Sequence, residues 1–147
     1  ESTRFESDTE TFEITSQKAV HGTRSLKIQL TTDTYSGISM QYMPRNWSGF
    51  SSLHLAAYNP QPHPVRLTIR IHDTAHEEKA VQPYSDRFNR SFTLAPRSWT
   101  PISIDLADVK NAPRTRRLNL ARIQNLGLFV TRAPEPWTLY IDHLRLE

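Results

Sequence analysis

The stretch Val65-Arg66-Leu67-Thr68-Ile69-Arg70-Ile71-His72 alternates strictly between apolar and polar residues. Successive side chains of a β-strand point to opposite faces of its sheet. Every second residue from Val65 to Ile71 is therefore predicted to face a core, and the intervening residues, from Arg66 to His72, to share the other face. The stretch predicts a strand with one apolar inner face and one outer face rich in hydrogen-bond donors.

Shorter runs of the same kind recur along the chain, separated by turns that contain Gly, Pro, Asn and Asp. The predicted strands cover residues 4–6, 11–15, 25–30, 38–43, 53–57, 65–72, 87–94, 102–106, 123–130 and 138–146. Residues 73–86 are predicted to form a long polar connection, and residues 107–122 to hold a short helical turn. One open sheet can bury only one face, so this pattern predicts an all-β fold of two packed antiparallel sheets, a β-sandwich or jelly roll.

Length and composition narrow the class of protein. The 147 residues suit one domain, predicted to span 1–147, and the absence of cysteine excludes disulfides and thiolate sites. A net charge of +3 without a long basic run argues against nucleic acid as a partner. No apolar segment is long enough to insert into a membrane. Because the first residue is Glu rather than Met, the chain is interpreted as a domain of a longer protein, without its own signal peptide.

Several short motifs, taken in order, resemble one family. They are Phe5-Glu6, His21-Gly22 followed by Ser25-Leu26-Lys27, Trp47-Ser48-Gly49-Phe50, Tyr58-Asn59-Pro60, Trp99 leading into Ile102-Ser103-Ile104-Asp105-Leu106, and Leu139-Tyr140-Ile141-Asp142. Over nearly its whole length the chain is similar to the non-catalytic carbohydrate-binding modules with a galactose-binding-domain-like β-jelly-roll. One departure is Pro96-Arg97-Ser98, which stands before Trp99 where many such modules have glycine.

The resemblance implies a monomeric binding module without catalysis, located outside the cell or in the cell envelope. It implies a polysaccharide or oligosaccharide partner, bound on the outer face of one sheet or at loop tips. The module would carry an attached enzyme or envelope protein to that glycan, either a neutral β-glucan or an acidic plant or algal polysaccharide. A structural calcium ion near the chain ends is also typical of such modules.

The candidate binding residues combine planar donors with aromatic rings. If the strands at 65–72 and 87–94 are neighbours, their outer faces form a patch of donors suited to sugar hydroxyls, carboxylates or sulfates. Aromatic rings stack on the apolar face of a pyranose. The predicted carbohydrate-binding residues are Arg70, His72, Asp73, Tyr84, Arg87, Asn89, Trp137 and Tyr35. The plainer interpretation of the patch is an ordinary solvated sheet face, and Asp73 is equally typical of a turn.

Glu6 and Asp142 are the candidate metal ligands. If the terminal strands pair, the two carboxylates would lie close together, and with turn carbonyls they would form a set of oxygen ligands suited to calcium. The alternative is that Asp142 accepts backbone hydrogen bonds at a strand end, which requires no ion.

Two other functions stay open. A structural or protein-interaction domain would carry an apolar outer patch instead of the donor patch. A small jelly-roll polysaccharide lyase or hydrolase would need an acid and a base that converge in one cleft. Glu77 and Glu78 are poorly placed for this, because adjacent carboxylates rarely span a scissile bond at the required separation.

Overall fold

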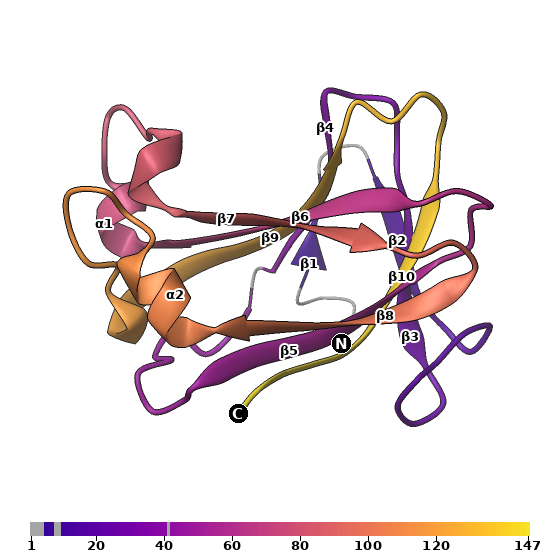
Figure 1. Ribbon diagram of the computed structural model, residues 1–147, viewed down its shortest axis with the longest axis horizontal. Helices are drawn as coiled ribbons and strands as arrows, with labels where there is room; N and C mark the ends of the chain where they lie inside the picture. The colour runs from indigo at the N-terminus through magenta and orange to yellow at the C-terminus, as the bar shows by residue number, and fades with distance from the viewer. Residues whose placement is uncertain (1–4, 8–9, 41) are drawn as a thin grey trace.

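Two five-stranded antiparallel sheets form the molecule, as the alternation predicted (Figure 1). The computed structural model describes residues 5–7, 10–40 and 42–147. Sheet A has the order β1 (Phe5–Glu6), β4 (Tyr35–Met40), β9 (Ile123–Thr131), β6 (Val65–Asp73) and β7 (Phe88–Leu94). Sheet B has the order β2 (Thr11–Thr15), β3 (Ser25–Gln29), β10 (Thr138–Leu146), β5 (Ser52–Asn59) and β8 (Ser98–Asp105). The predicted strand residues Arg4 and Gln41 lie outside the described part of the chain.

The core fills the space between the sheets. The inner residues of β6, from Val65 to Ile71, are at most 2% exposed, as their alternation predicted. Strand β3 contributes Leu26 and Ile28 in the same way. Trp47 is 2% exposed, and its indole Nε1 donates to the carbonyl of Pro44 at 2.7 Å. This tryptophan is therefore a core residue.

Short helices gather at one end of the sandwich (Figure 1). Helix α2 (Leu106–Asn111) begins one residue before the predicted helical region and lies otherwise inside it, and the 3-10 turn η3 (Leu120–Arg122) precedes β9. The connection after β6 is not purely irregular, because it holds α1 (Thr74–Glu77) and the 3-10 turn η2 (Tyr84–Asp86). The side chain of Asp73 caps α1 by accepting from the His76 amide. No helix in the described ranges is long and apolar enough to cross a membrane.

The two terminal strands do not pair, which corrects the premise of the predicted metal site. Strand β1 lies at the edge of sheet A beside β4, whereas β10 lies inside sheet B between β3 and β5. Glu6 lies opposite Ser39 on the outer face of sheet A. Asp142 follows the core residue Ile141 and so lies on the outer side of sheet B. The two carboxylates are on opposite sides of the sandwich and do not converge on one ion.

Candidate functional site

A row of small and polar residues crosses the outer face of sheet A. The pairing of β6 with β7 and β9 places Arg70 directly opposite Asn89 on one side and Gly127 on the other. The predicted neighbourhood of the two donor-bearing strands is thus confirmed. Gly127 is opposite Ser39 of β4, which is opposite Glu6 of β1. Directly paired residues share one face of a sheet, so the row runs across all five strands.

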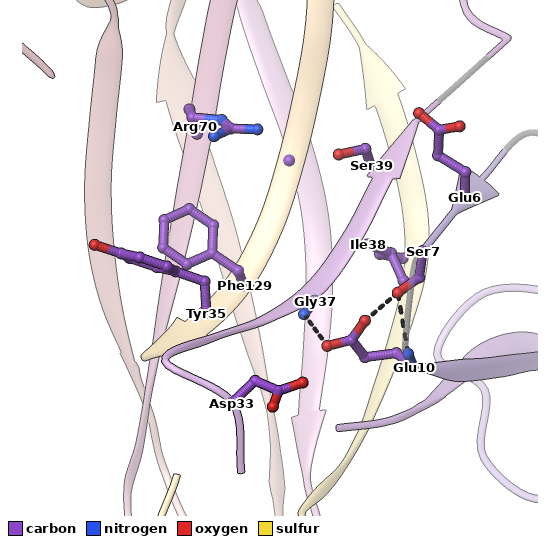
Figure 2. Close-up of a pocket in the computed structure, with 11 residues that line it drawn as sticks. Glu6, Ser7, Glu10, Asp33, Tyr35, Gly37, Ile38, Ser39, Arg70 and Phe129 are labelled. Carbon is purple, nitrogen blue, oxygen red and sulfur yellow. Dashed lines mark hydrogen bonds between the residues drawn. The ribbon is translucent and has the colours of Figure 1, made fainter. Parts of the chain in front are cut away.

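Four residues of the row, Glu6, Ser39, Gly127 and Arg70, line an open cleft of about 430 Å³, and Asn89 lies next to Arg70 at its border. Arg70, Phe129 and Tyr35 lie on one side of it, and Glu6, Ser7 and Glu10 on the other (Figure 2). The Tyr35 ring is 70% exposed and meets the Phe129 ring edge to face, with 5.8 Å between the centroids. The cleft therefore offers aromatic surface beside a guanidinium group, a combination suited to the apolar faces and the hydroxyls of a sugar.

Two glycines keep the floor of the cleft low. A Cβ at Gly37 would lie 1.9 Å from the carbonyl oxygen of Leu128, so the close approach of β4 to β9 requires glycine there. A Cβ at Gly127 would make only ordinary contacts, the nearest at 3.5 Å. Gly127 is therefore not required by packing, and its missing side chain leaves space above the sheet.

Arg87, Asn89 and Tyr84 form a second cluster beside Arg70, along β7 and the turn before it. Arg87 Nε donates to Asn89 Oδ1 at 3.2 Å, and Asn89 Nδ2 donates to the Tyr84 carbonyl at 3.3 Å. The guanidinium carbon of Arg87 lies 5.7 Å from the centre of the exposed Tyr84 ring. Burial lowers the pKa of both Arg70 and Arg87, and the charge of Arg87 lowers that of Arg70 further. Both groups remain cations that are partly stripped of water.

Carboxylates line the cleft along β1 and at the start of β4. Glu10 accepts a hydrogen bond from the Gly37 amide at 3.0 Å and another from the Ser7 hydroxyl (Figure 2). Asp33 accepts from Thr31 Oγ1 at 2.9 Å. Charges of both signs therefore face the same space, and the basic character expected from the arginines is confined to the β6 and β7 side.

Asp73 and His72 have structural partners of their own. Asp73 is fully buried and accepts from both terminal guanidinium nitrogens of Arg116, at 2.8 and 2.9 Å, and from the amides of His76 and Asn119. It presents no accessible oxygen to a ligand. His72 is 4% exposed, and its Nε2 lies 2.6 Å from a carboxylate oxygen of Glu77. Burial lowers the pKa of His72 and so favours the neutral imidazole, although the neighbouring Glu77 acts in the opposite direction.

Arg116 also holds Asp86, and this cluster organises the end of the sandwich next to the cleft. Its Nε donates to Asp86 Oδ1 at 2.8 Å, while His76 Nδ1 and Lys79 Nζ contact the same carboxylate. Hydrogen bonds from Arg116 lower the pKa of Asp86 despite its burial. Burial would raise the pKa of Asp73, but its hydrogen bonds, led by those from Arg116, bring it below its ordinary value. One arginine thus joins the start of α1, the turn η2 and the chain before β9.

The remaining predicted residues lie outside the cleft. Trp137 is half-buried against the core, beside the ring of His63 at 5.1 Å. The side-chain oxygens of Asp142 accept from the amides of Val20, His21 and His143 at 2.7 to 2.9 Å, which matches the ion-free alternative. Within the described residues, no group of three or more His, Asp or Glu side chains is arranged to hold a metal. Calcium stays a prediction of the resemblance, without a site at Glu6 and Asp142.

The structure adds residues to the cleft that the sequence did not single out. Among them are Phe129, Gly127, Gly37 and Ser39. A glycine inside a strand often marks close approach of a ligand or of another backbone. Gly127, which interrupts the apolar run from Leu126 to Val130, carried that signal in the sequence.

Solved structures with the same fold are numerous, although no family model matches the chain and no curated protein resembles it in sequence at a significant level. An exo-β-agarase has a TM-score of 0.75 at 17% identity, over 99% of this chain and 23% of the agarase chain. A family 11 carbohydrate-binding module from Clostridium thermocellum, in complex with a β-1,3-1,4-mixed-linked tetrasaccharide, has a TM-score of 0.69 at 14% identity, over 97% of this chain and 88% of the module. A family 22 module of Clostridium thermocellum Xyn10B reaches 0.56 at 13% identity, over 96% and 82% of the two chains. The jelly-roll fold predicted for this chain is thereby confirmed, and the chain spans about a quarter of the agarase.

Proposed function

We propose that this chain is a non-catalytic module that binds a polysaccharide in the cleft on the outer face of sheet A. The observation that carries the proposal is the row from Glu6 to Arg70, which lines the cleft across four strands, with Asn89 of β7 next to Arg70. An extended sugar chain needs such a long, open site rather than a closed pocket. Aromatic surface at Tyr35 and Phe129 and the donors of Arg70 border the floor.

The similarity in fold supports the same proposal. Two of the similar structures are carbohydrate-binding modules whose length this chain nearly matches, and one of them was solved with a glucan tetrasaccharide. A third is an agarase of which this chain covers 23%. We propose that the module is part of a larger extracellular or cell-envelope protein and holds it on its glycan. Tethering raises the local concentration of the attached protein at the polymer without any bond being made or broken.

Affinity electrophoresis tests the proposal. The wild-type chain and an Arg70→Ala variant are run through native gels that contain barley mixed-linkage glucan, hydroxyethylcellulose, agarose, carboxymethylcellulose or κ-carrageenan. At least one polymer is expected to retard the wild type, and Arg70→Ala is expected to bind it about tenfold more weakly, since the cleft loses its central donor. Ser103→Ala on the exposed face of β8 in sheet B is the control and should migrate like the wild type. Equal, unretarded migration in every gel would contradict the proposal.

One feature favours the runner-up, a domain that packs against another protein surface. A largely apolar cleft of about 270 Å³ is lined by residues from both sheets and from the loop before β5. It is lined by Met40, Met43, Pro44, Trp47, Phe50, Leu53, Leu126, Leu144, Arg145 and Leu146. If no polysaccharide in the gels retards the chain, this apolar cleft becomes the better candidate for a binding surface.

A further inference from the structure

Three buried polar atoms without a hydrogen-bond partner lie together beside the floor of the cleft. They are Arg70 Nε, His72 Nδ1 and Asn125 Oδ1, three of the six such side-chain atoms in the part of the chain that the structure describes. Arg70 and His72 are successive outer-face residues of β6, and Asn125 of β9 lies directly opposite His72. Buried polar groups nearly always have a partner. Three such atoms at one place therefore indicate that something outside the protein completes their hydrogen bonds.

Gly127 opens this place to the cleft. It lies directly opposite Arg70, and it is the next outer-face residue after Asn125 on β9. A Cβ at position 127 would have three nearest neighbours, Asn125 Oδ1 at 3.5 Å, Arg70 Nε at 3.6 Å and Arg70 Nη2 at 3.7 Å. The missing side chain thus leaves a space bounded by one donor group and one acceptor. A small rotation of either side chain turns its polar atom toward a ligand that enters this space.

The chemistry of the three atoms is complementary to hydroxyl groups. Arg70 can only donate, and Asn125 Oδ1 can only accept. In a neutral His72 whose Nε2 donates to Glu77, Nδ1 is also an acceptor. A hydroxyl both donates and accepts, so neighbouring hydroxyls of a sugar ring can satisfy the donor and the acceptors together. A carboxylate or sulfate only accepts, and it would bring negative charge against the lone pairs of Asn125 and His72.

We propose that Asn125 and Gly127 make this part of the cleft a subsite for the uncharged hydroxyls of a neutral polysaccharide, and that it disfavours carboxylated and sulfated chains. The inference rests on the proposed function and narrows it to one class of ligand. It runs against the net charge of +3, which by itself favours an acidic polymer. The reason is local, because the acceptors beside Arg70 decide which groups can bind there.

Two matched pairs of polymers test the subsite. Hydroxyethylcellulose and carboxymethylcellulose share one backbone, and agarose and κ-carrageenan are a neutral and a sulfated galactan. Dissociation constants come from electrophoretic mobility at several polymer concentrations. The wild type is expected to bind the neutral member of at least one pair about tenfold more tightly than the charged member. Asn125→Leu, which removes the acceptor at similar size, and Gly127→Ala, which fills the space, should each weaken neutral binding about tenfold.

Thr93→Ala on the exposed outer face of β7 is the matched control and should bind like the wild type. Thermal unfolding of each variant checks the fold, and Gly127→Ala should keep it because its new methyl group makes only ordinary contacts. Tighter binding of the charged polymers by the wild type would overturn the subsite while leaving polysaccharide binding intact. The subsite would also be overturned, with polysaccharide binding intact, if Asn125→Leu and Gly127→Ala both bind the neutral polymer as tightly as the wild type does. A wild type that none of the polymers retards would overturn the proposed function and the subsite together.

Discussion

Tyr35 and Phe129 show how a single residue can contribute to this cleft without supporting the fold. Tyr35 is largely exposed and was a candidate for stacking from its sequence alone. Phe129 follows the run Leu126-Gly127-Leu128, and its place on the outer face emerges only from the register of β9 against β6. Exposure of Tyr35 and Tyr84 agrees with a binding role, whereas Trp137 packs against the core and Asp73 is fully enclosed. Local patterns identified residue types suited to sugars, but burial depends on contacts that are distant in sequence.

We predict that Tyr35→Ala weakens polysaccharide binding about tenfold, or about 1.4 kcal/mol, because a sugar ring loses its exposed aromatic partner. The temperature of unfolding should change little, since the ring lies mostly in solvent. Isothermal titration calorimetry with the polymer that retards the wild type measures the effect. Tyr42→Ala is the matched control, because Tyr42 is similarly exposed and does not line the cleft. Equal losses in the two variants would place the stacking surface elsewhere.

At the scale of elements, the strands were predictable from the sequence, whereas helix α1 and the pairing of the terminal strands were not. The alternating stretches became strands because a two-residue period is a local property of the sequence. The helix α1 was missed because it has only four residues, too few to show a helical period in the sequence. The pairing assumed for the terminal strands was wrong, because the local sequence does not determine that β1 joins sheet A and β10 joins sheet B.

Arg116 is predicted to be a major stabilising residue. Arg116→Ala leaves two buried carboxylates, Asp73 and Asp86, without their shared cation, and should lower the free energy of unfolding by about 3–5 kcal/mol. Urea unfolding at neutral pH measures the change. Arg114→Ala removes an exposed arginine of the same loop and should cost about 0.5 kcal/mol or less. A small effect of Arg116→Ala would mean that His76 and Lys79 suffice to hold Asp86.

The same cluster predicts how stability depends on pH. The pKa values of Asp73 and Asp86 are lower in the folded chain than the ordinary value of 3.8. Their contribution is therefore complete above about pH 4 and is lost as the pH falls further toward the folded-state values. The wild type should lose stability more steeply than Arg116→Ala between pH 4 and pH 2, measured by urea unfolding at each pH. Parallel slopes for the two proteins would show that the cluster does not set the acid response.

At the scale of the whole molecule, the core that stabilises the sandwich and the cleft lie on different faces of the sheets. Both sheets contribute their inner faces to one core, while the cleft belongs to the outer face of sheet A alone. The short helices and the Arg116 cluster lie at one end, where they fix the loop that carries Tyr84 and Arg87. The two-sheet fold followed from the sequence because many short alternating strands need a second sheet to bury their apolar faces. The sheet face that carries the cleft could not be predicted from the sequence, because it depends on which strands are neighbours.

Mapping the bound sugar on the chain tests the central claim most directly. Backbone amide chemical shifts are recorded while the protein is titrated with a β-1,3-1,4-mixed-linkage glucan tetrasaccharide and, separately, with agarose-derived oligosaccharides. We expect saturable shifts in at least one titration, concentrated in β4, β6 and β9 around Gly37, Arg70 and Gly127. Few should occur in β2, β3 or β8 of sheet B. Shifts centred on sheet B, or no saturable shift with either sugar, would contradict a polysaccharide-binding cleft on sheet A.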